Sequence, residues 1–393
     1  MPESFCLPWS CMPVSPFPEL LKGVYGRLPG PWTAGVDLYL GRRHGGRRQP
    51  ARLDVMTALG GAEVDVLQVM LLSLSETHPR DRVEFWLLHL GLAAEKLAEL
   101  TAFCDGLPNL RLHLVRVPDR DQFVLLSKLG GRPFGARFLW FVAHLHLPAD
   151  LQRVIFLDPL DTLVTDDLVP FLHHPFAGRY VVACREVPSL PPLIIKPGRA
   201  AHADGAPAAR ILRASKGVMN SGVMVINLAK MRRDQLGVDH YIEVARWARD
   251  EMGLTFGDQG LFSLTHGSHY LQAHDRNNFR FFSSPGRVPK MRPSVLHFAG
   301  NIPKPFNLRL SLQQEQQIAR LSQTASRGIV HLTPRQIISP AFFRHYRSWW
   351  ETCARTPCFA RLAPLADART ALTLANIHAD PTANRAAPAR AAG

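Results

Sequence analysis

Long apolar runs are missing from this sequence, and cysteine is scarce. No stretch reaches the roughly 18 uninterrupted apolar residues of a membrane-spanning helix. The six cysteines form no CxxC pair, and Cys353 and Cys358 have no histidines at zinc-ligand spacing. The first thirty residues lack the cationic start and apolar core of a secretory signal. These absences argue against a zinc site and a secreted protein, and they predict free thiols in a cytoplasmic protein, either soluble or associated with a membrane surface.

Acidic residues are also in the minority. The chain has 46 Lys and Arg against 32 Asp and Glu, a net charge of +14, which predicts a polyanionic partner. Nucleic acid, anionic lipid and a nucleotide-charged substrate would each satisfy this charge. No known nucleic-acid-binding motif is present, so we expect no nucleic-acid partner. The basic, aromatic segment 341–350 suits either peripheral contact with an anionic membrane or a helix packed on the domain, and the sequence leaves both open.

The order of apolar segments predicts three regions. Residues 1–50 form an irregular Pro- and Arg-rich extension, 51–310 a folded domain, and 311–393 a basic, aromatic and then Ala/Pro-rich extension. Strands are expected at 53–59, 83–90, 110–118, 154–158, 180–184, 223–228 and 295–300. Helices are expected at 63–79, 93–107, 137–147 and 240–249, and a long surface loop at 188–210. Such alternation predicts an α/β fold with a mixed, mostly parallel sheet flanked by helices.

Asp158 and Asp161 follow the predicted strand 154–158 in the sequence VIFLDPLDTLV. Ligands of parallel sheets bind at the carboxyl ends of the strands, so both aspartates are candidate site residues. A hard divalent cation would hold two neighbouring carboxylates ionised. A turn around Pro159 is an equally good interpretation of this segment alone.

Three further segments carry polar groups at the ends of predicted elements. Asn220, Ser221 and Gly222 form a polar turn where a ligand can approach the backbone. Asp258 and Gln259 lie between glycines, although Asp258 is also a good helix N-cap. His297 lies at the end of the last predicted strand, and the Gly300 turn and Lys304 come after it. A histidine and a lysine there suit metal and phosphate, or a structural hydrogen bond.

Taken in order, these four segments resemble glycosyltransferase family 8, the retaining nucleotide-sugar enzymes that include bacterial lipopolysaccharide galactosyl- and glucosyltransferases and glycogenin. The resemblance rests on LQRVIFLDPLDTLVTDDLVPFL, MNSGVMVINLAKMRR, GDQGLFS and HFAGNIPKPF, and it runs from Leu53 to Phe306. It implies the GT-A fold of nucleotide-diphospho-sugar transferases. It also implies Mn²⁺ or Mg²⁺ as cofactor, a UDP-sugar donor and a glycan or lipid-linked glycan acceptor. The implied activity is retaining hexosyl transfer in lipopolysaccharide or other cell-surface polysaccharide synthesis, with the enzyme in the cytoplasm or at the inner face of the plasma membrane.

The resemblance assigns roles residue by residue. Metal ligands would be Asp158, Asp161 and His297. Donor contacts would be Thr57, Ala58, Arg137, Asn220, Ser221, Gly222, Gly300 and Lys304. Asp258 and Gln259 would lie next to the transferred sugar, where they would act in catalysis.

Three departures from the family pattern keep alternatives open. Two residues separate Asp158 from Asp161 where the family has one, Gly60-Gly61 replaces an acidic pair, and Gly260 stands where many relatives have an aspartate. One alternative is a catalytically impaired relative that binds nucleotide sugars. Another is a phosphatase of the haloacid-dehalogenase type. The stretch VIFLDPLDTLV superficially resembles the first motif of those enzymes, but it lacks the glycine that the motif needs.

Overall fold

The computed structural model describes most of the predicted domain and a C-terminal helical segment. The described residues are 49–61, 63–131, 135–186, 193–195, 219–267, 270–280, 292–299, 304–307 and 340–365. Almost all of the predicted N-terminal extension, most of the predicted loop 188–210 and Gly300 lie outside them.

A seven-stranded sheet forms the centre of the molecule, as the sequence predicts. Its order is β10-β6-β8-β4-β1-β2-β3, and β8 alone runs antiparallel to its neighbours. The strands are β1 (Arg52–Leu59), β2 (Arg82–His89), β3 (Leu110–Arg116), β4 (Arg153–Leu157), β6 (Val181–Arg185), β8 (Met219–Asn227) and β10 (Tyr270–Gln272). This mixed, mostly parallel sheet confirms the predicted α/β class.

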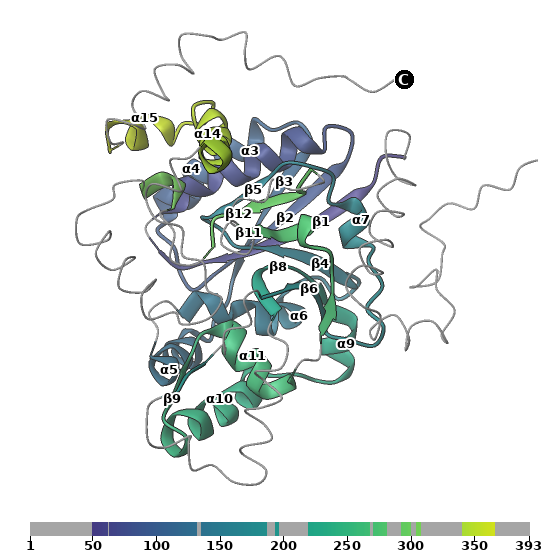
Figure 1. The fold of residues 1–393 in the computed structure, drawn as a ribbon, viewed down its shortest axis with the longest axis vertical. Helices are drawn as coiled ribbons and strands as arrows, with labels where there is room; N and C mark the ends of the chain where they lie inside the picture. The colour runs from purple at the N-terminus through teal and green to yellow at the C-terminus, as the bar shows by residue number, and fades with distance from the viewer. Residues whose placement is uncertain are drawn as a thin grey trace, which may run out of the picture.

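Helices cover both faces of the sheet because both faces are apolar (Figure 1). Leu53 and Val55 of β1 pack with α3 (Leu67–Thr77) and α4 (Ala94–Asp105). Met56 of β1 points the other way, as strand geometry requires, into a core shared with the helices of the opposite face. These are α5 (Arg120–Gly130), η3 (Gly135–Val142), α6 (Ala143–His146), α10 (Val238–Arg246) and α11 (Asp258–His266).

Short elements complete the fold. A second sheet joins β11 (Phe279–Arg280), β12 (Val295–His297) and β5 (Thr162–Val164), with His297 opposite Thr162. A third pairs β7 (Leu193–Ile195) with β9 (Leu254–Phe256). The remaining elements are η2 (Val64–Val66), α7 (Val169–Leu172), α9 (Leu228–Arg233), the π-helical η5 (Trp247–Glu251), η6 (Asp275–Asn278), η8 (Pro305–Asn307) and η9 (Ala363–Leu365).

Two local predictions need correction. The loop predicted at 188–210 contains β7, whose apolar residues pair with β9 and so satisfy backbone groups. The helix predicted at 137–147 is mainly 3-10, over Gly135–Val142, and only its last turn is α-helical. A side chain at Gly135 would meet the Phe123 carbonyl oxygen at 2.8 Å, so this segment lies close against α5.

The C-terminal helices α14 (Pro340–Cys353) and α15 (Phe359–Leu362) lie next to α3 (Figure 1). Tyr346, Trp349 and Trp350 are buried in a core that also contains Leu163 and Phe298 from the second sheet. Arg361 of α15 forms ion pairs with acidic residues just before α3. The sequence left open whether this segment contacts a membrane or packs on the domain, and in the structure it is a helix packed on the domain. Over the described residues, none of the helices combines the length and apolar character needed to cross a membrane.

Candidate functional site

Polar residues converge at the carboxyl edge of the central sheet. Asp158 follows β4 and Glu186 follows β6, so both lie where parallel strands end. Because β8 is antiparallel, its first residues reach the same edge, and Asn220 and Gly222 join them. The Asp158 amide donates to the Gly222 carbonyl at 2.7 Å, which extends the β4–β8 pairing to the aspartate.

Two aspartates and a histidine meet at this edge. Asp158 and Asp161 occupy a bend between β4 and β5, closed by a 2.7 Å bond from the Thr162 hydroxyl to the Asp158 carbonyl. His297 ends β12, and the Phe298 amide donates to the Asp161 carbonyl at 2.8 Å. One ligand atom from each of Asp158, Asp161 and His297 lies within 4.8 Å of the others. The structure thus brings together the three residues predicted as metal ligands.

Lys304 compensates part of the negative charge of this group. Its ammonium donates to Asp161 Oδ2 and, at 2.7 Å, to the Phe298 carbonyl. Burial opposes ionisation of Asp161, but Lys304 and His297 outweigh it and hold the pKa of the Asp161 carboxyl well below its usual range. Burial and the charge of Asp161 raise the pKa of Asp158 well above its ordinary value. Without a cation, therefore, the two neighbouring carboxyls oppose each other's ionisation.

The group also has the chemistry of a divalent-cation site. Asp161 Oδ1 is buried and accepts no hydrogen bond, and it lies 3.3 Å from His297 Nε2. Two carboxylates and an imidazole are ligands that Mn²⁺ and Mg²⁺ or related cations accept. A cation would supply the charge that the unpaired oxygen lacks, so the residues fit the predicted cofactor.

Asp258 and Gln259 begin α11 beside this edge. Asp258 makes no N-cap bond with its side chain and instead accepts from the Trp140 indole at 3.0 Å. Gln259 accepts from the Ser221 amide at 3.3 Å and donates to Glu186 at 3.4 Å. The N-cap of α11 is Gly257, so the cap interpretation of Asp258 is wrong. Gln259 belongs to the same polar network as β8, whereas Asp258 is held by Trp140 of η3.

The other predicted donor contacts are more scattered. Arg137 of η3 reaches α11, since a side chain at Gly257 would lie 3.4 Å from its Nη1. Thr57 is fully buried, and its hydroxyl donates to the Leu157 carbonyl at 2.7 Å, linking β1 to β4. Ala58 is buried beside it. The donor contacts assigned to Thr57 and Ala58 stay predictions.

Three buried or half-buried residues at this edge, Glu186, Asn278 and Arg280, lie outside the four segments that resemble the family. Glu186 pairs with Arg280 at 2.6 Å and accepts from Asn220 at 2.7 Å. Asn278 contacts both Asn220 and His297. Glu186 follows a predicted strand, so the rule that identified Asp158 would also have found it. Asn278 lies in DRNN, where no pattern indicates a role.

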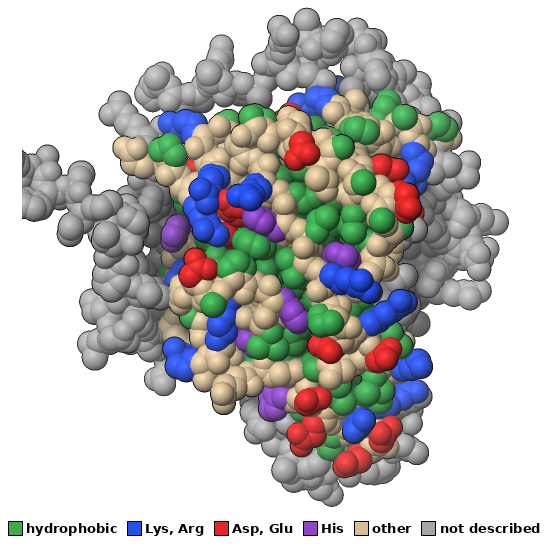
Figure 2. Space-filling model, turned by 180° about the vertical axis from the view of Figure 1, so that it is seen from behind, with side chains coloured by type: hydrophobic (Ala, Val, Ile, Leu, Met, Phe, Trp, Pro, Cys, Tyr) green, Lys and Arg blue, Asp and Glu red, His purple; other side chains and the backbone are tan. Residues whose placement is uncertain are grey.

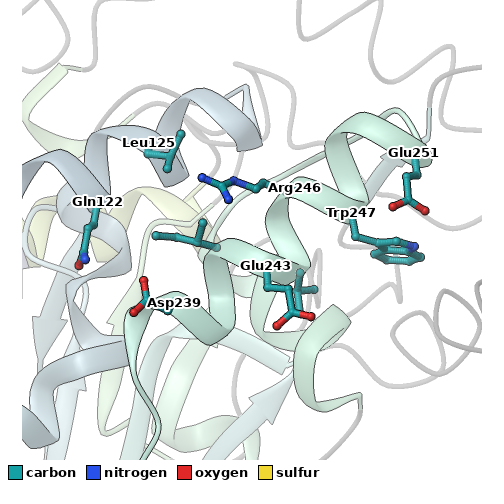
Figure 3. Close-up of a pocket in the computed structure, with 9 residues that line it drawn as sticks. Gln122, Leu125, Asp239, Glu243, Arg246, Trp247 and Glu251 are labelled. Carbon is teal, nitrogen blue, oxygen red and sulfur yellow. The ribbon is translucent and has the colours of Figure 1, made fainter.

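Two other features are separate from this edge. His78, Asp81 and Asp167 also lie close together, but His78 Nδ1 contacts the Leu74 carbonyl and Nε2 accepts from the Leu168 amide. Both ring nitrogens are thus used in holding the backbone. A pocket of about 750 Å³ opens between α5 and α10, lined by Gln122, Glu243 and Trp247 among others (Figure 3). None of the predicted site residues lines it.

Comparison with known proteins agrees with this geometry. Residues 136–307, which contain the aspartate pair, His297 and Lys304, match the profile described as Glycosyl transferase family 8. An active-site mutant of LgtC is 20% identical, and the match covers 70% of this chain and 97% of that chain with a TM-score of 0.50. The apo structure of the bifunctional WbbM is 14% identical, and the match covers 81% of this chain and 52% of WbbM with a TM-score of 0.50. No curated protein sequence gives a significant match.

At these identities the solved structures establish the fold, and the profile match establishes the family of the matched segment. The matched residues include Asp158, Asp161 and His297, the candidate metal ligands at the sheet edge. Residues 136–307 therefore match glycosyl transferase family 8, and the chain has the GT-A fold.

Proposed function

We propose that the protein is a metal-dependent, retaining glycosyltransferase that moves a hexose or related sugar from a UDP-sugar to a glycan or lipid-linked glycan. The proposal extends to lipopolysaccharide or other cell-surface polysaccharide synthesis. One observation carries it: Asp158, Asp161 and His297 form a cation-competent group inside the segment that matches the family.

Mn²⁺ or Mg²⁺ held by these three residues would neutralise the diphosphate as charge develops on it. The Lys304 ammonium contacts the carboxylate of Asp161, one of the candidate metal ligands, so it can stabilise the departing phosphate oxygens. Asp258 and Gln259, held by Trp140 and Ser221, would orient the sugar. With these groups the protein supplies positioning and electrostatics, which is what front-face retention asks of it.

A thermal-shift screen tests the class and the cofactor together. We expect UDP and UDP-sugars to raise the melting temperature only when Mn²⁺ or Mg²⁺ is present, since binding to the folded state alone stabilises it. Wild-type protein should then release UDP from one sugar nucleotide of a panel. Asp161→Asn should lose the metal-dependent shift and at least about 99% of turnover, because one oxyanion-stabilising group supplies about 10²-fold or more. Asp150→Asn, at an exposed aspartate before β4, is the matched control and should behave as wild type.

The alternatives give different results in the same experiment. A catalytically impaired relative would show the metal-dependent shift with UDP but no turnover of any sugar nucleotide. A phosphatase would release phosphate from a generic phosphoester without any response to UDP. Turnover of UDP-sugars by Asp161→Asn at the wild-type rate would refute the metal assignment.

Peripheral contact with an anionic membrane remains part of the proposal because of the net charge of +14. On the face seen in Figure 2, basic side chains intermingle with acidic ones and form no continuous basic surface. The buried aromatic residues of α14 are likewise engaged inside the protein. Sedimentation with anionic vesicles at several salt concentrations would test membrane contact directly.

A further inference from the structure

A line of hydrogen bonds connects the backbone of β8 to the candidate metal ligand His297. The Gly222 amide donates to Asn220 Oδ1 at 3.1 Å, and Asn278 Nδ2 donates to the same oxygen at 2.8 Å. Asn278 Oδ1 in turn lies 2.9 Å from His297 Nδ1. Asn220 Nδ2 donates sideways to Glu186 Oε2 at 2.7 Å. All three side chains of the line are buried, so water does not replace these partners.

The Gly222 amide, which can only donate, and the Glu186 carboxylate fix the direction of every hydrogen bond in this line. A backbone amide can only donate, so the atom of Asn220 next to Gly222 must be its oxygen. The other Asn220 atom is then the amide nitrogen, which agrees with its carboxylate partner Glu186. Asn278 must therefore give its nitrogen to Asn220 and turn its oxygen toward His297. An amide oxygen only accepts, so His297 Nδ1 must carry the proton.

When the ring is neutral, this assignment leaves a lone pair on His297 Nε2, which a proton or a metal cation can occupy. Nε2 faces Asp161 Oδ1 at 3.3 Å, and that oxygen accepts no hydrogen bond. Two acceptors directed at each other repel unless a cation lies between or beside them. A histidine that ligates through one ring nitrogen generally has its tautomer fixed by a hydrogen bond from the other.

We propose that Asn278 is a positioning residue that holds His297 in the Nδ1-protonated tautomer, so that Nε2 is presented to a divalent cation together with Asp158 and Asp161. The inference rests on the proposed metal-dependent function for its purpose, but the tautomer itself is a property of the metal-free chain. Gly222 also contributes, because it lies against the ring, where any side chain would meet His297 Cε1 at 2.0 Å. Asn278 and Gly222 together fix both the protonation and the plane of the imidazole.

The tautomer is measured by long-range ¹H–¹⁵N correlation spectroscopy on metal-free protein labelled with ¹⁵N-histidine. The spectrum of His297→Gln identifies the signals of His297 by their loss. In the neutral ring of the wild type we expect the proton to be on Nδ1. A neutral wild-type ring with its proton on Nε2 would overturn the proposal without any variant being made.

Two variants of Asn278 test its role. Asn278→Asp keeps an oxygen next to Nδ1 and should retain the tautomer, whereas Asn278→Leu removes it and should give a mixture of tautomers. We expect Asn278→Leu to bind Mn²⁺ about 10- to 100-fold more weakly, with and without UDP, by electron paramagnetic resonance of the free ion. An unchanged tautomer and affinity in Asn278→Leu would contradict the proposal.

Asn109→Leu controls for a purely structural effect. Asn109 donates to the Ser75 and His78 carbonyls far from the sheet edge, so its loss should lower the melting temperature without changing the His297 tautomer or Mn²⁺ affinity. Absence of sugar transfer in a wild-type protein that has the expected tautomer and binds Mn²⁺ would refute the proposed function and leave this inference standing.

Discussion

At the scale of single residues, Gly222 makes the tightest contact of the site. A Cβ atom there would lie 2.0 Å from His297 Cε1, so Gly222→Ala must displace the ring or bend β8. We expect a loss of about 1–3 kcal/mol in stability, as for overpacked cores. Mn²⁺ affinity should fall at least about tenfold because the ligand moves. Thermal unfolding and Mn²⁺ titration by paramagnetic resonance measure the two effects.

Gly237 offers the matched control for this substitution. A side chain at Gly237 would meet no heavy atom within 4 Å, so Gly237→Ala should leave Mn²⁺ affinity at the wild-type value. Wild-type Mn²⁺ affinity in Gly222→Ala would show that the ring of His297 is not where the cation binds.

The residues of the site differ in how well the sequence predicts them. Asp158 and Asp161 follow an apolar strand and His297 ends one, and the ends of such strands are where sheets bind ligands. Glu186 follows the same rule. Asn278 obeys no such rule, because its place depends on the pairing of β11 with β12, two short strands that a residue pattern barely distinguishes from loop.

At the scale of elements, the one-turn helix α6 buries a histidine that should make the protein sensitive to acid. Burial lowers the pKa of His144 to about 4, and the positive charge of Arg232 acts in the same direction. An unfolded histidine titrates near 6.5. As pH falls from about 6.5 toward 4, the unfolded chain takes up a proton that the folded chain refuses, so stability is lost across this window.

His144→Gln should therefore flatten the pH dependence of stability between pH 6.5 and 4, by about 3 kcal/mol at most. Urea unfolding at several pH values measures the difference. His240→Gln, at an exposed position of α10, should keep the wild-type dependence. Equal slopes for His144→Gln and wild type would mean that His144 takes up its proton without loss of the fold.

Elements of the fold were predictable in proportion to their length and apolar pattern. The strands β1 and β2 match their predictions closely because each is a long run of buried residues, and β3 matches although only its first residue, Leu110, is buried. The 3-10 helix η3 has the same apolar periodicity as an α-helix, so spacing alone did not distinguish them. The strand β7 lies in a Pro-rich stretch and takes its structure from β9, a partner distant in the sequence.

At the scale of the whole molecule, the C-terminal helices act as part of the core. Trp349 is fully buried on the second sheet and α3, so Trp349→Ala should cost about 3–5 kcal/mol of stability. Arg347→Ala, at an exposed position of the same helix, should change stability by less than about 0.5 kcal/mol. Denaturant unfolding measures both. Unchanged stability of Trp349→Ala, combined with loss of binding to anionic vesicles, would assign the aromatic residues to a membrane.

The antiparallel strand β8 is made late, so the central sheet is completed only late in the synthesis of this protein. β8 is made well after β4, yet it pairs along the whole length of β4 and inserts between β4 and β6. Until residue 227 leaves the ribosome, β4 is therefore an unpaired, apolar edge of the kind that aggregates. The cation ligands are completed later still, since His297 of β12 follows β8 in the chain. Translational pausing between residues 158 and 219 should thus lower the yield of folded protein, whereas pausing after residue 365, beyond the helices that complete the core, should not.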